Sequence, residues 1–247
     1  MKGVILAGGT GTRLAPLTRV TNKHLLPVFD RPMIYYPLGC VRNLGIDEVV
    51  IVTGGDHLNT YKRLLGDGSE HGLRAIHYAV QDGAGGIAQA LALAEPFVGK
   101  DDICVILGDN IIERNVRHAA DAFREQGGGA KVILHEVPDP HRFGVARLEM
   151  NGSGHKIVDI IEKPKDPPSN YAVIGIYFYD SDVFDICRTL KPSHRGELEI
   201  TDVNRAYLER GRLTYDFLDG WWADAGTPDA LLRTGLRVSE SGANKVD

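Results

Sequence analysis

Short apolar runs alternate with amphipathic segments through the first half of the chain. The runs at 4–7, 49–53, 75–80, 103–107 and 131–137 have the length of strands, and near-continuous apolar strands are typical of a parallel sheet buried on both faces. Helical spacing separates them at 33–44, 58–65, 87–94 and 116–125, and Gly127 follows the last of these as a stop signal. This alternation predicts a doubly wound α/β fold with a mostly parallel sheet.

Beyond residue 137 the strand-like segments follow one another more closely. Residues 145–150 and 156–162 are joined by Asn151-Gly152, which is typical of a hairpin turn, and a third run covers 172–180. Helical spacing returns at 182–190 and 202–210. We expect these elements to lie over the carboxyl edge of the sheet as a second lobe of one compact unit.

Composition narrows the class of protein. The 247 residues are 43% hydrophobic and 25% charged, which is ordinary for a globular protein. Lys and Arg number 28 against 33 Asp and Glu, a net charge of −5, so a nucleic-acid-binding protein is not expected. No apolar run reaches about 18 residues and no signal peptide is evident, so neither membrane insertion nor export is expected, and the cytoplasm is the expected compartment.

Cysteine and histidine spacing argues against a structural metal site. Cys40, Cys104 and Cys187 are widely separated, contain no C-x-x-C pair and are odd in number, so neither a disulfide framework nor a zinc site is predicted. The nine histidines show no H-E-x-x-H spacing.

A glycine-rich turn follows the first predicted strand. Gly8, Gly9 and Gly11 would let backbone N–H groups approach a phosphate at the carboxyl end of that strand, where open α/β sheets bind ligands. A Walker A loop requires a Gly-Lys pair that is missing, and Leu14 stands where a dinucleotide fingerprint has its third glycine. The alternative is a tight turn without a ligand.

Two cations accompany this turn. Arg13 ends the loop, and Lys23 follows in the run NKHLLP. Lys23 is either a solvated surface charge or a cation brought back over a polyphosphate.

The motifs LAGGTGTRLAPLT, NKHLLPV and DRPMIYYPL resemble the signature of the sugar-1-phosphate nucleotidyltransferases, and within them the glucose-1-phosphate thymidylyltransferases. The similarity continues through LLGDGS, LGDN, EKP, SNYAVIGIYFYD, KPSHRGELEITDVN and YLERG, across nearly the whole chain. The resemblance implies one nucleotidyltransferase domain over 1–247. Its nucleotide-binding part covers about 1–137, an inserted sugar-binding lobe about 138–227, and a C-terminal helix about 228–240.

Nucleotidyl transfer concentrates negative charge at phosphorus, so a divalent cation, Mg²⁺, is expected with carboxylate ligands. Asp109 follows an apolar strand and is the first candidate, although it could also cap a following helix. Asp224 could likewise cap the helix that begins near Pro228. The resemblance makes Asp109 and Asp224 the two metal ligands.

The sugar end is inferred mainly from the resemblance. A carboxylate can accept from sugar hydroxyls and an ammonium can bind phosphate, so Glu162 and Lys163 suit those tasks, although such a pair is often only surface charge. The resemblance adds sugar-phosphate contacts at Asn110, Gly144, Val173 and Arg195. Tyr177 and Tyr179 share one strand face and belong either to the core or to the pocket wall.

For the nucleotide, the resemblance implies contacts at Gly8, Gly9, Gly11, Thr12, Arg13, Gln81, Gly86 and Asp109. An amide such as that of Gln81 can donate and accept toward a pyrimidine. The segment QDGAGGIAQA lacks the prolines usual in relatives between Gln81 and Gly86. Thymine and uracil differ by one methyl group, worth about 1–3 kcal/mol, so both dTTP and UTP are expected substrates.

The implied reaction is attack by the phosphate of glucose 1-phosphate on the α-phosphorus, with release of pyrophosphate. Arg13, Lys23, Asp109 and Lys163 are the expected catalytic residues, and a homo-oligomer is the expected assembly. Relatives continue with further C-terminal helices that help form a regulatory nucleotide site, so that form of control is not expected here. The alternatives are another nucleoside triphosphate or sugar phosphate, a non-catalytic sugar-nucleotide-binding subunit, and a dehydrogenase.

Overall fold

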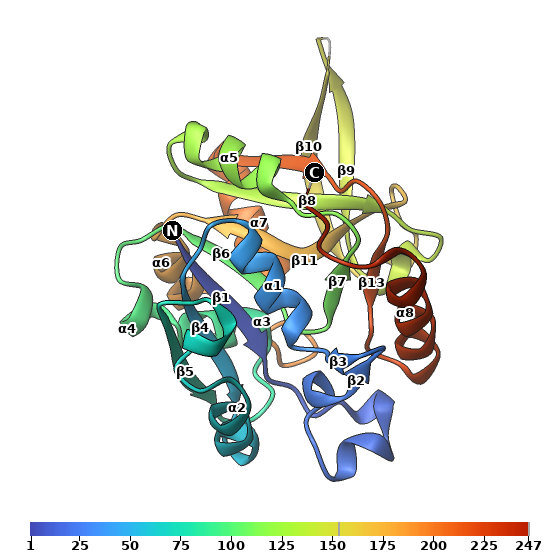
Figure 1. The fold of residues 1–247 in the computed structure, drawn as a ribbon. Coiled ribbons are helices and arrows are strands. Elements are labelled where there is room, and N and C mark those ends of the chain that lie inside the picture. Colours follow the sequence, from blue (N-terminus) through green and yellow to red (C-terminus); the bar gives the residue numbers. More distant parts are fainter. Residues whose placement is uncertain (153, 247) are drawn as a thin grey trace.

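A mixed sheet forms the centre of the computed structural model, which describes residues 1–152 and 154–246 (Figure 1). Strands β6, β1, β4 and β5 are parallel neighbours, whereas β11 runs antiparallel to β6 and β8. The path is β10-β9-β11-β6-β1-β4-β5, and β8 pairs with both β11 and β12. The strands are β1 (Lys2–Ala7), β4 (Glu48–Gly54), β5 (Ala75–Gln81), β6 (Ile103–Leu107), β8 (Ala130–Glu136), β9 (Gly144–Asn151), β10 (Gly154–Glu162), β11 (Tyr171–Tyr179) and β12 (Leu213–Phe217). The predicted α/β fold with a mostly parallel sheet is confirmed.

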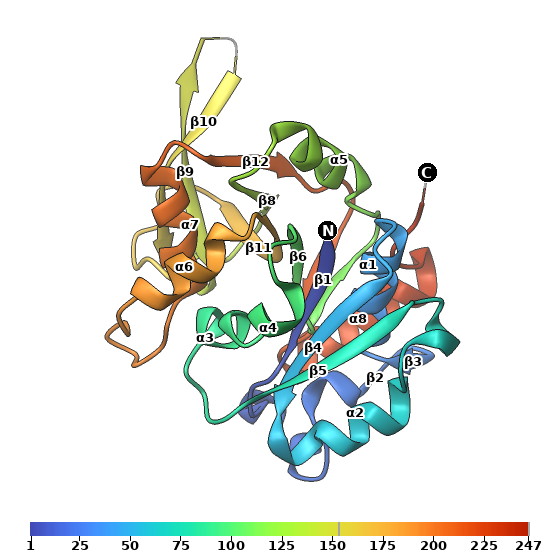
Figure 2. The ribbon, with the colours of Figure 1, turned by 90° about the vertical axis from the view of Figure 1, so that its left-hand side faces the viewer.

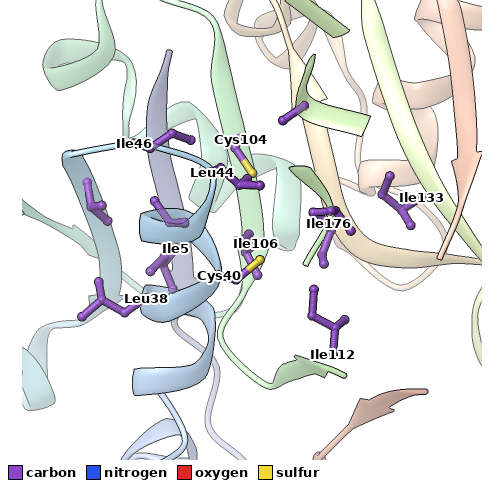
Figure 3. Packing of buried hydrophobic residues seen from close by; sticks show 14 of the residues in the cluster. Ile5, Leu38, Cys40, Leu44, Ile46, Cys104, Ile106, Ile112, Ile133 and Ile176 are labelled. Atoms are coloured by element: carbon purple, nitrogen blue, oxygen red, sulfur yellow. The ribbon is translucent and has the colours of Figure 1, made fainter. Parts of the chain in front are cut away.

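Helices cover both faces of the sheet (Figure 2). One face carries α1 (Tyr35–Asn43), α2 (Leu58–Leu65) and α5 (Arg117–Gln126), and the other carries α3 (Ile87–Ala92), α4 (Glu95–Val98), α6 (Asp182–Thr189) and α7 (Ile200–Glu209). Successive strand residues point to opposite faces, so β1 supplies Ile5 to one core and Val4 to the other. Figure 3 shows Ile5 beside Leu38, and Ile106 beside Cys40, in the first core.

The predicted helices form with shifted ends. The segment 87–94 gives α3, after which a separate short helix, α4, has Pro96 in its first turn. Proline has no N–H for an intrahelical bond, so it suits the start of a new helix better than the interior of a longer one.

The second half of the chain joins the same sheet, which corrects the expectation that it lies over the carboxyl edge. Strands β9 and β10 form the predicted hairpin, which projects from the body of the molecule (Figure 1). Strand β11 then inserts between β9 and β6. Nearly all of its residues are buried, as a central strand with two covered faces requires.

Two short ribbons lie beside the main sheet, β2 (Pro27–Val28) with β3 (Arg31–Pro32) and β7 (Asn110–Ile112) with β13 (Trp222–Asp224). Neither was predicted, because segments this short show no periodicity. The β7–β13 pairing places Asp224 opposite Asn110. Within the part of the chain that the structure describes there are six 3-10 turns: η1 (Thr12–Leu14), η2 (Leu17–Arg19), η3 (Lys23–Leu25), η4 (Gly55–His57), η5 (Ser69–His71) and η6 (Pro140–Arg142).

The C-terminal helix α8 (Pro228–Ser241) forms where it was predicted and packs beside β2 and β13. Its N-cap is Thr227, whose hydroxyl accepts from the N–H of Ala230 at 3.3 Å, so Asp224 does not cap it. All three cysteines are buried free thiols. Across the described residues, every helix is too short or too polar to span a bilayer. The division of the chain near residues 137 and 227 stays a prediction.

Candidate active site

A cleft of about 740 Å³ opens beyond the carboxyl ends of β1 and β6. Its wall combines the glycine-rich turn, the residues after β6, the end of β10, the middle of β11, and β13. The predicted site residues that line it are Gly8, Gly9, Arg13, Lys23, Gln81, Gly86, Asp109, Asn110, Gly144, Glu162, Lys163, Val173, Arg195 and Asp224. Gly11 and Thr12 do not line it. Residues from distant parts of the sequence are therefore brought to one site.

The glycine-rich turn is shaped by close contacts. A Cβ on Gly8 would lie 2.7 Å from Oε1 of Gln81, and one on Gly11 would lie 3.1 Å from Cβ of Lys23. Gly11 also has φ 61°, and its carbonyl accepts from the hydroxyl of Thr18 at 2.9 Å. Gly11 thus lets the segment carrying Lys23 fold back against the turn, although it does not itself face the cleft.

Lys23 is held in the cleft by its buried neighbours. Asn22 is 3% exposed, and its Nδ2 donates to the carbonyl of Ala7 at 3.3 Å. Its Oδ1 accepts from the backbone N–H of His24 and the hydroxyl of Tyr61. The Lys23 ammonium then donates to Oδ2 of Asp109. This contact excludes the alternative in which Lys23 is only a solvated surface charge.

The two candidate metal ligands titrate in opposite directions. Burial opposes ionisation of Asp109, but the charge of Lys23, together with the hydrogen bonds that Lys23 and Asn110 donate, outweighs it and lowers the pKa of Asp109 below its ordinary value. Burial, and then the negative charge of Asp109, together raise the pKa of Asp224 to about 6. Asp109 is thus ionised near neutral pH, while Asp224 is easily protonated.

Asn110 and Trp222 orient Asp109. Nδ2 of Asn110 donates to Oδ1 of Asp109 at 3.0 Å, and its Oδ1 accepts from Nε1–H of Trp222 at 2.7 Å and from N–H of Gly175 at 2.9 Å. Asn110 is 5% exposed. These bonds give Asn110 a positioning role, and its predicted sugar-phosphate contact stays a prediction.

The carboxylates fit a divalent cation. Among the described residues, Oδ1 of Asp224 is one of few buried side-chain oxygens without a hydrogen-bond partner, which suits an atom that binds a metal ion. A Cβ on Gly226 would lie 2.7 Å from that oxygen and 2.9 Å from Nη2 of Arg13, so both groups converge over this glycine. Nowhere in the described chain do three acidic, His or Cys side chains gather as a closed cage, which leaves the pair Asp109 and Asp224 as the candidate ligands.

The predicted sugar end of the cleft is a network of carboxylates around one arginine. Oε2 of Glu162 accepts from the hydroxyl of Thr201 at 2.6 Å, and both pack against Gly144, where a Cβ would lie 3.0 Å from Thr201 Oγ1. The Arg195 guanidinium donates to Glu199 at 2.8 Å and to Glu197 at 3.0 Å, and it lies 3.5 Å from Glu162.

At the predicted base end, the Gln81 amide has a defined orientation. Its Nε2 donates to the carbonyl of Gly86 at 3.1 Å and to Oε1 of Gln89 at 2.9 Å. Oε1 of Gln81 therefore remains an acceptor lying over Gly8. Gly86 has φ 98°, and a Cβ there would lie 2.4 Å from the carbonyl oxygen of Leu198, so the loop that carries Gly86 packs closely against the segment before α7.

Some lining residues were not found from the sequence. His24, Arg142, Glu199 and Thr201 line the cleft; His24 and Arg142 stand in short turns, and Glu199 and Thr201 stand at the start of α7, where no pattern marks their direction. Burial, then the charge of Lys23, lowers the pKa of His24 to about 3, so the imidazole is neutral at physiological pH. Tyr177 also lines the cleft, whereas Tyr179 is buried and donates to Asn204 at 2.6 Å.

Comparison with known proteins identifies the family of the chain. Residues 2–241 match the family described as nucleotidyl transferase. The chain belongs to this family. Among curated nucleotidyl transferases, the glucose-1-phosphate thymidylyltransferase of Neisseria meningitidis serogroup A is 47% identical over 238 residues, 94% of this chain and 80% of the relative. The enzyme of the same name from Xanthomonas campestris is 48% identical over 236 residues, 93% of this chain and 78% of the relative.

Two solved structures share the nucleotidyl transferase fold. A Bacillus anthracis protein assigned as a glucose-1-phosphate thymidylyltransferase, solved in complex with a sucrose, has a TM-score of 0.91 and 53% identity, covering 97% of this chain and 96% of its own. A UDP-glucose pyrophosphorylase complexed with UDP-glucose has a TM-score of 0.85 and 27% identity, covering 97% and 98%.

Proposed function

We propose that this nucleotidyltransferase joins dTTP to α-D-glucose 1-phosphate, giving dTDP-glucose and pyrophosphate. One observation carries the proposal. Asp109 and Asp224 face one cleft between a glycine-rich turn with Arg13 on one side and Glu162 with Lys163 on the other. The curated relatives named above carry the name of this activity.

The reaction needs no protein nucleophile. An oxygen of the sugar phosphate attacks the α-phosphorus in line, a new P–O bond forms, and the bond from the α-phosphorus to the bridging oxygen breaks with that electron pair leaving on pyrophosphate. Positioning and charge stabilisation supply the rate. In this proposal Arg13 binds the departing pyrophosphate, while Lys23 and Lys163 hold the reacting phosphates.

Mg²⁺ is the proposed metal, with Asp109 and Asp224 as its protein ligands. When bound, it would neutralise charge on the phosphate oxygens around the reacting phosphorus. The low pKa of Asp109 keeps one ligand ionised, and the partnerless oxygen of Asp224 offers the second. A homo-oligomeric, cytoplasmic enzyme belongs to the same proposal.

Base selection rests on Gln81. Its free Oε1 would accept from N3–H of thymine or uracil, whereas N3 of cytosine is itself an acceptor and would face it without a hydrogen. UTP is therefore the second candidate nucleotide, and the UDP-glucose pyrophosphorylase neighbour favours including it. CTP should be rejected.

The test is a substrate panel with pyrophosphate release as the readout. The purified protein is incubated with Mg²⁺, glucose 1-phosphate and each of dTTP, UTP, CTP, ATP and GTP, and then with dTTP and other sugar 1-phosphates. We expect turnover with dTTP or UTP and none with CTP. Equal turnover with CTP would refute the role of Gln81, and no turnover with any pair would refute the enzymatic function.

A further inference from the structure

The cleft has a cation that none of the assigned roles uses. Arg142 lines it from the η6 turn, directly before Phe143 and Gly144. Phe143 packs edge-on against Trp222, with ring centroids 5.2 Å apart, and Trp222 belongs to the strand that carries Asp224. Arg142 is also near enough for its charge to lower the pKa of Asp224, although burial and Asp109 dominate that group.

Arg142 lies on the sugar side of the cleft. The carbonyl of Phe143 accepts from the backbone N–H of Lys163 at 2.9 Å, and Gly144 pairs with Glu162 across β9 and β10. Arg142 and Lys163 therefore emerge from adjacent backbone segments. The proposed nucleotide phosphates lie beside Arg13 and the glycine-rich turn, whose backbone is not paired with this segment.

The other cations at the proposed sugar end, Arg195 and Lys163, are already paired with carboxylates. Arg195 shares its charge with Glu162, Glu197 and Glu199, with N–O separations of 3.5, 3.0 and 2.8 Å. The Lys163 ammonium lies 3.3 Å from Glu162. This wall suits sugar hydroxyls, but a phosphate dianion placed there needs further positive charge.

Arg142 can supply that charge at small expense. Its partner is Asp139, at 2.7 Å, which lies outside the cleft, and both side chains are more than one-third exposed. Exposed ion pairs of this kind contribute only about 0–1 kcal/mol to the stability of a protein, so a phosphate can displace the Asp139 carboxylate from Arg142. A guanidinium also offers two parallel N–H donors that match phosphate oxygens.

We infer that Arg142 is a substrate-binding residue whose guanidinium leaves Asp139 to bind the phosphate of the sugar 1-phosphate. The inference rests on the proposed function, because it assigns a residue to one of its two substrates. It leaves Lys163 and Arg195 in place and adds a cation on the face nearest Asp224.

The ion pair between Arg142 and Asp139 can be broken from either end, which separates a binding role from a structural one. Arg142→Gln removes the positive charge, and Arg142→Lys keeps the charge but lacks the two parallel N–H donors of the guanidinium. Asp139→Asn, which breaks the same ion pair and leaves Arg142 unchanged, is the matched control. Steady-state kinetics would vary glucose 1-phosphate and dTTP separately, with thermal melting of each variant as a check on folding.

For Arg142→Gln we expect KM for glucose 1-phosphate to rise roughly 10- to 100-fold, the loss typical of a charge-assisted phosphate contact, with KM for dTTP within about twofold. Arg142→Lys should recover part of this loss, and Asp139→Asn should stay within about twofold of the native protein. If Arg142→Gln does not fold, the comparison of Arg142→Lys with Asp139→Asn carries the test.

Three results would overturn the inference. Equal losses in Asp139→Asn and the Arg142 variants would make the pair structural. A rise in KM for dTTP instead would place Arg142 on the nucleotide, and unchanged kinetics would remove it from the site. Failure of the native protein to turn over any substrate pair would instead refute the proposed function.

Discussion

Replacing Asp224 by Asn should stabilise the metal-free protein while abolishing turnover. Burial first, and then repulsion from Asp109, raises the pKa of Asp224 from 3.8 to about 6. At about 1.4 kcal/mol per pKa unit, this difference of 2.2 corresponds to roughly 3 kcal/mol. Because the folded-state pKa is raised, the protonated form is favoured in the folded protein. Ionised Asp224 therefore lowers the stability of the native protein above pH 6, and this loss of stability disappears below pH 3.8.

The assay is thermal or urea unfolding in the presence of a chelator, at pH 8 and at pH 4. At pH 8 the free energy of unfolding of Asp224→Asn should exceed that of the native protein by about 2–3 kcal/mol. This corresponds to a rise in Tm of roughly 4–12 °C for a chain of this size. The gain should shrink toward zero at pH 4, where the native carboxyl group is protonated.

Asp109→Asn is the matched control, with the opposite sign. The pKa of Asp109 is lowered by Lys23, so its ionised form adds stability above its ordinary pKa, and this stability is lost as pH falls through the folded value. Asp109→Asn should therefore be destabilised at pH 8. Asp224→Asn could instead be less stable than the native protein at pH 8, or be stabilised by the same amount at pH 4 as at pH 8. Either result would show that burial and Asp109 do not raise the pKa of Asp224.

Three further outcomes follow from the structure. Adding Mg²⁺ should raise the Tm of the native protein but not that of Asp224→Asn, and a Tm rise of the same size in both would refute the assigned ligand. Gly86→Ala should lower stability by roughly 1–3 kcal/mol in urea unfolding, since φ is 98° and the new Cβ would meet the Leu198 carbonyl at 2.4 Å; a change under about 0.5 kcal/mol would contradict this. Phe123→Ala should cost about 3–5 kcal/mol by the same measurement, because Phe123 is fully buried against Phe178, and a loss below about 1 kcal/mol would mean that the core refills the space.

Most of the fold could be predicted from the sequence because its strands are long apolar runs. Residues 103–107 and 49–53 show the pattern required by a sheet covered on both faces, and they form β6 and β4. The place of β11 was missed, although its unbroken apolar run carried the same signal. Because β11 follows the β9–β10 hairpin in the sequence, it was predicted to lie with that hairpin over the edge of the sheet. Its pairing with β6 instead places it in the middle of the sheet.

The site was predictable where a residue type is unusual for its position. Asp109 at the end of a buried strand and the glycines after β1 were found in this way. Arg142 and Glu199 could not be found, because nothing local distinguishes a loop charge that faces a cleft from one that faces solvent. The direction of Arg142 depends on contacts of Phe143 with Trp222 and Lys163, which are far away in the sequence.

The most direct test of the central claim is ³¹P NMR of the purified protein with dTTP, glucose 1-phosphate and Mg²⁺, run beside Asp224→Asn. The account predicts that the native protein produces the resonances of dTDP-glucose and pyrophosphate, and that the variant, although more stable without metal, produces neither. Undiminished product from Asp224→Asn, or none from the native protein, would contradict it.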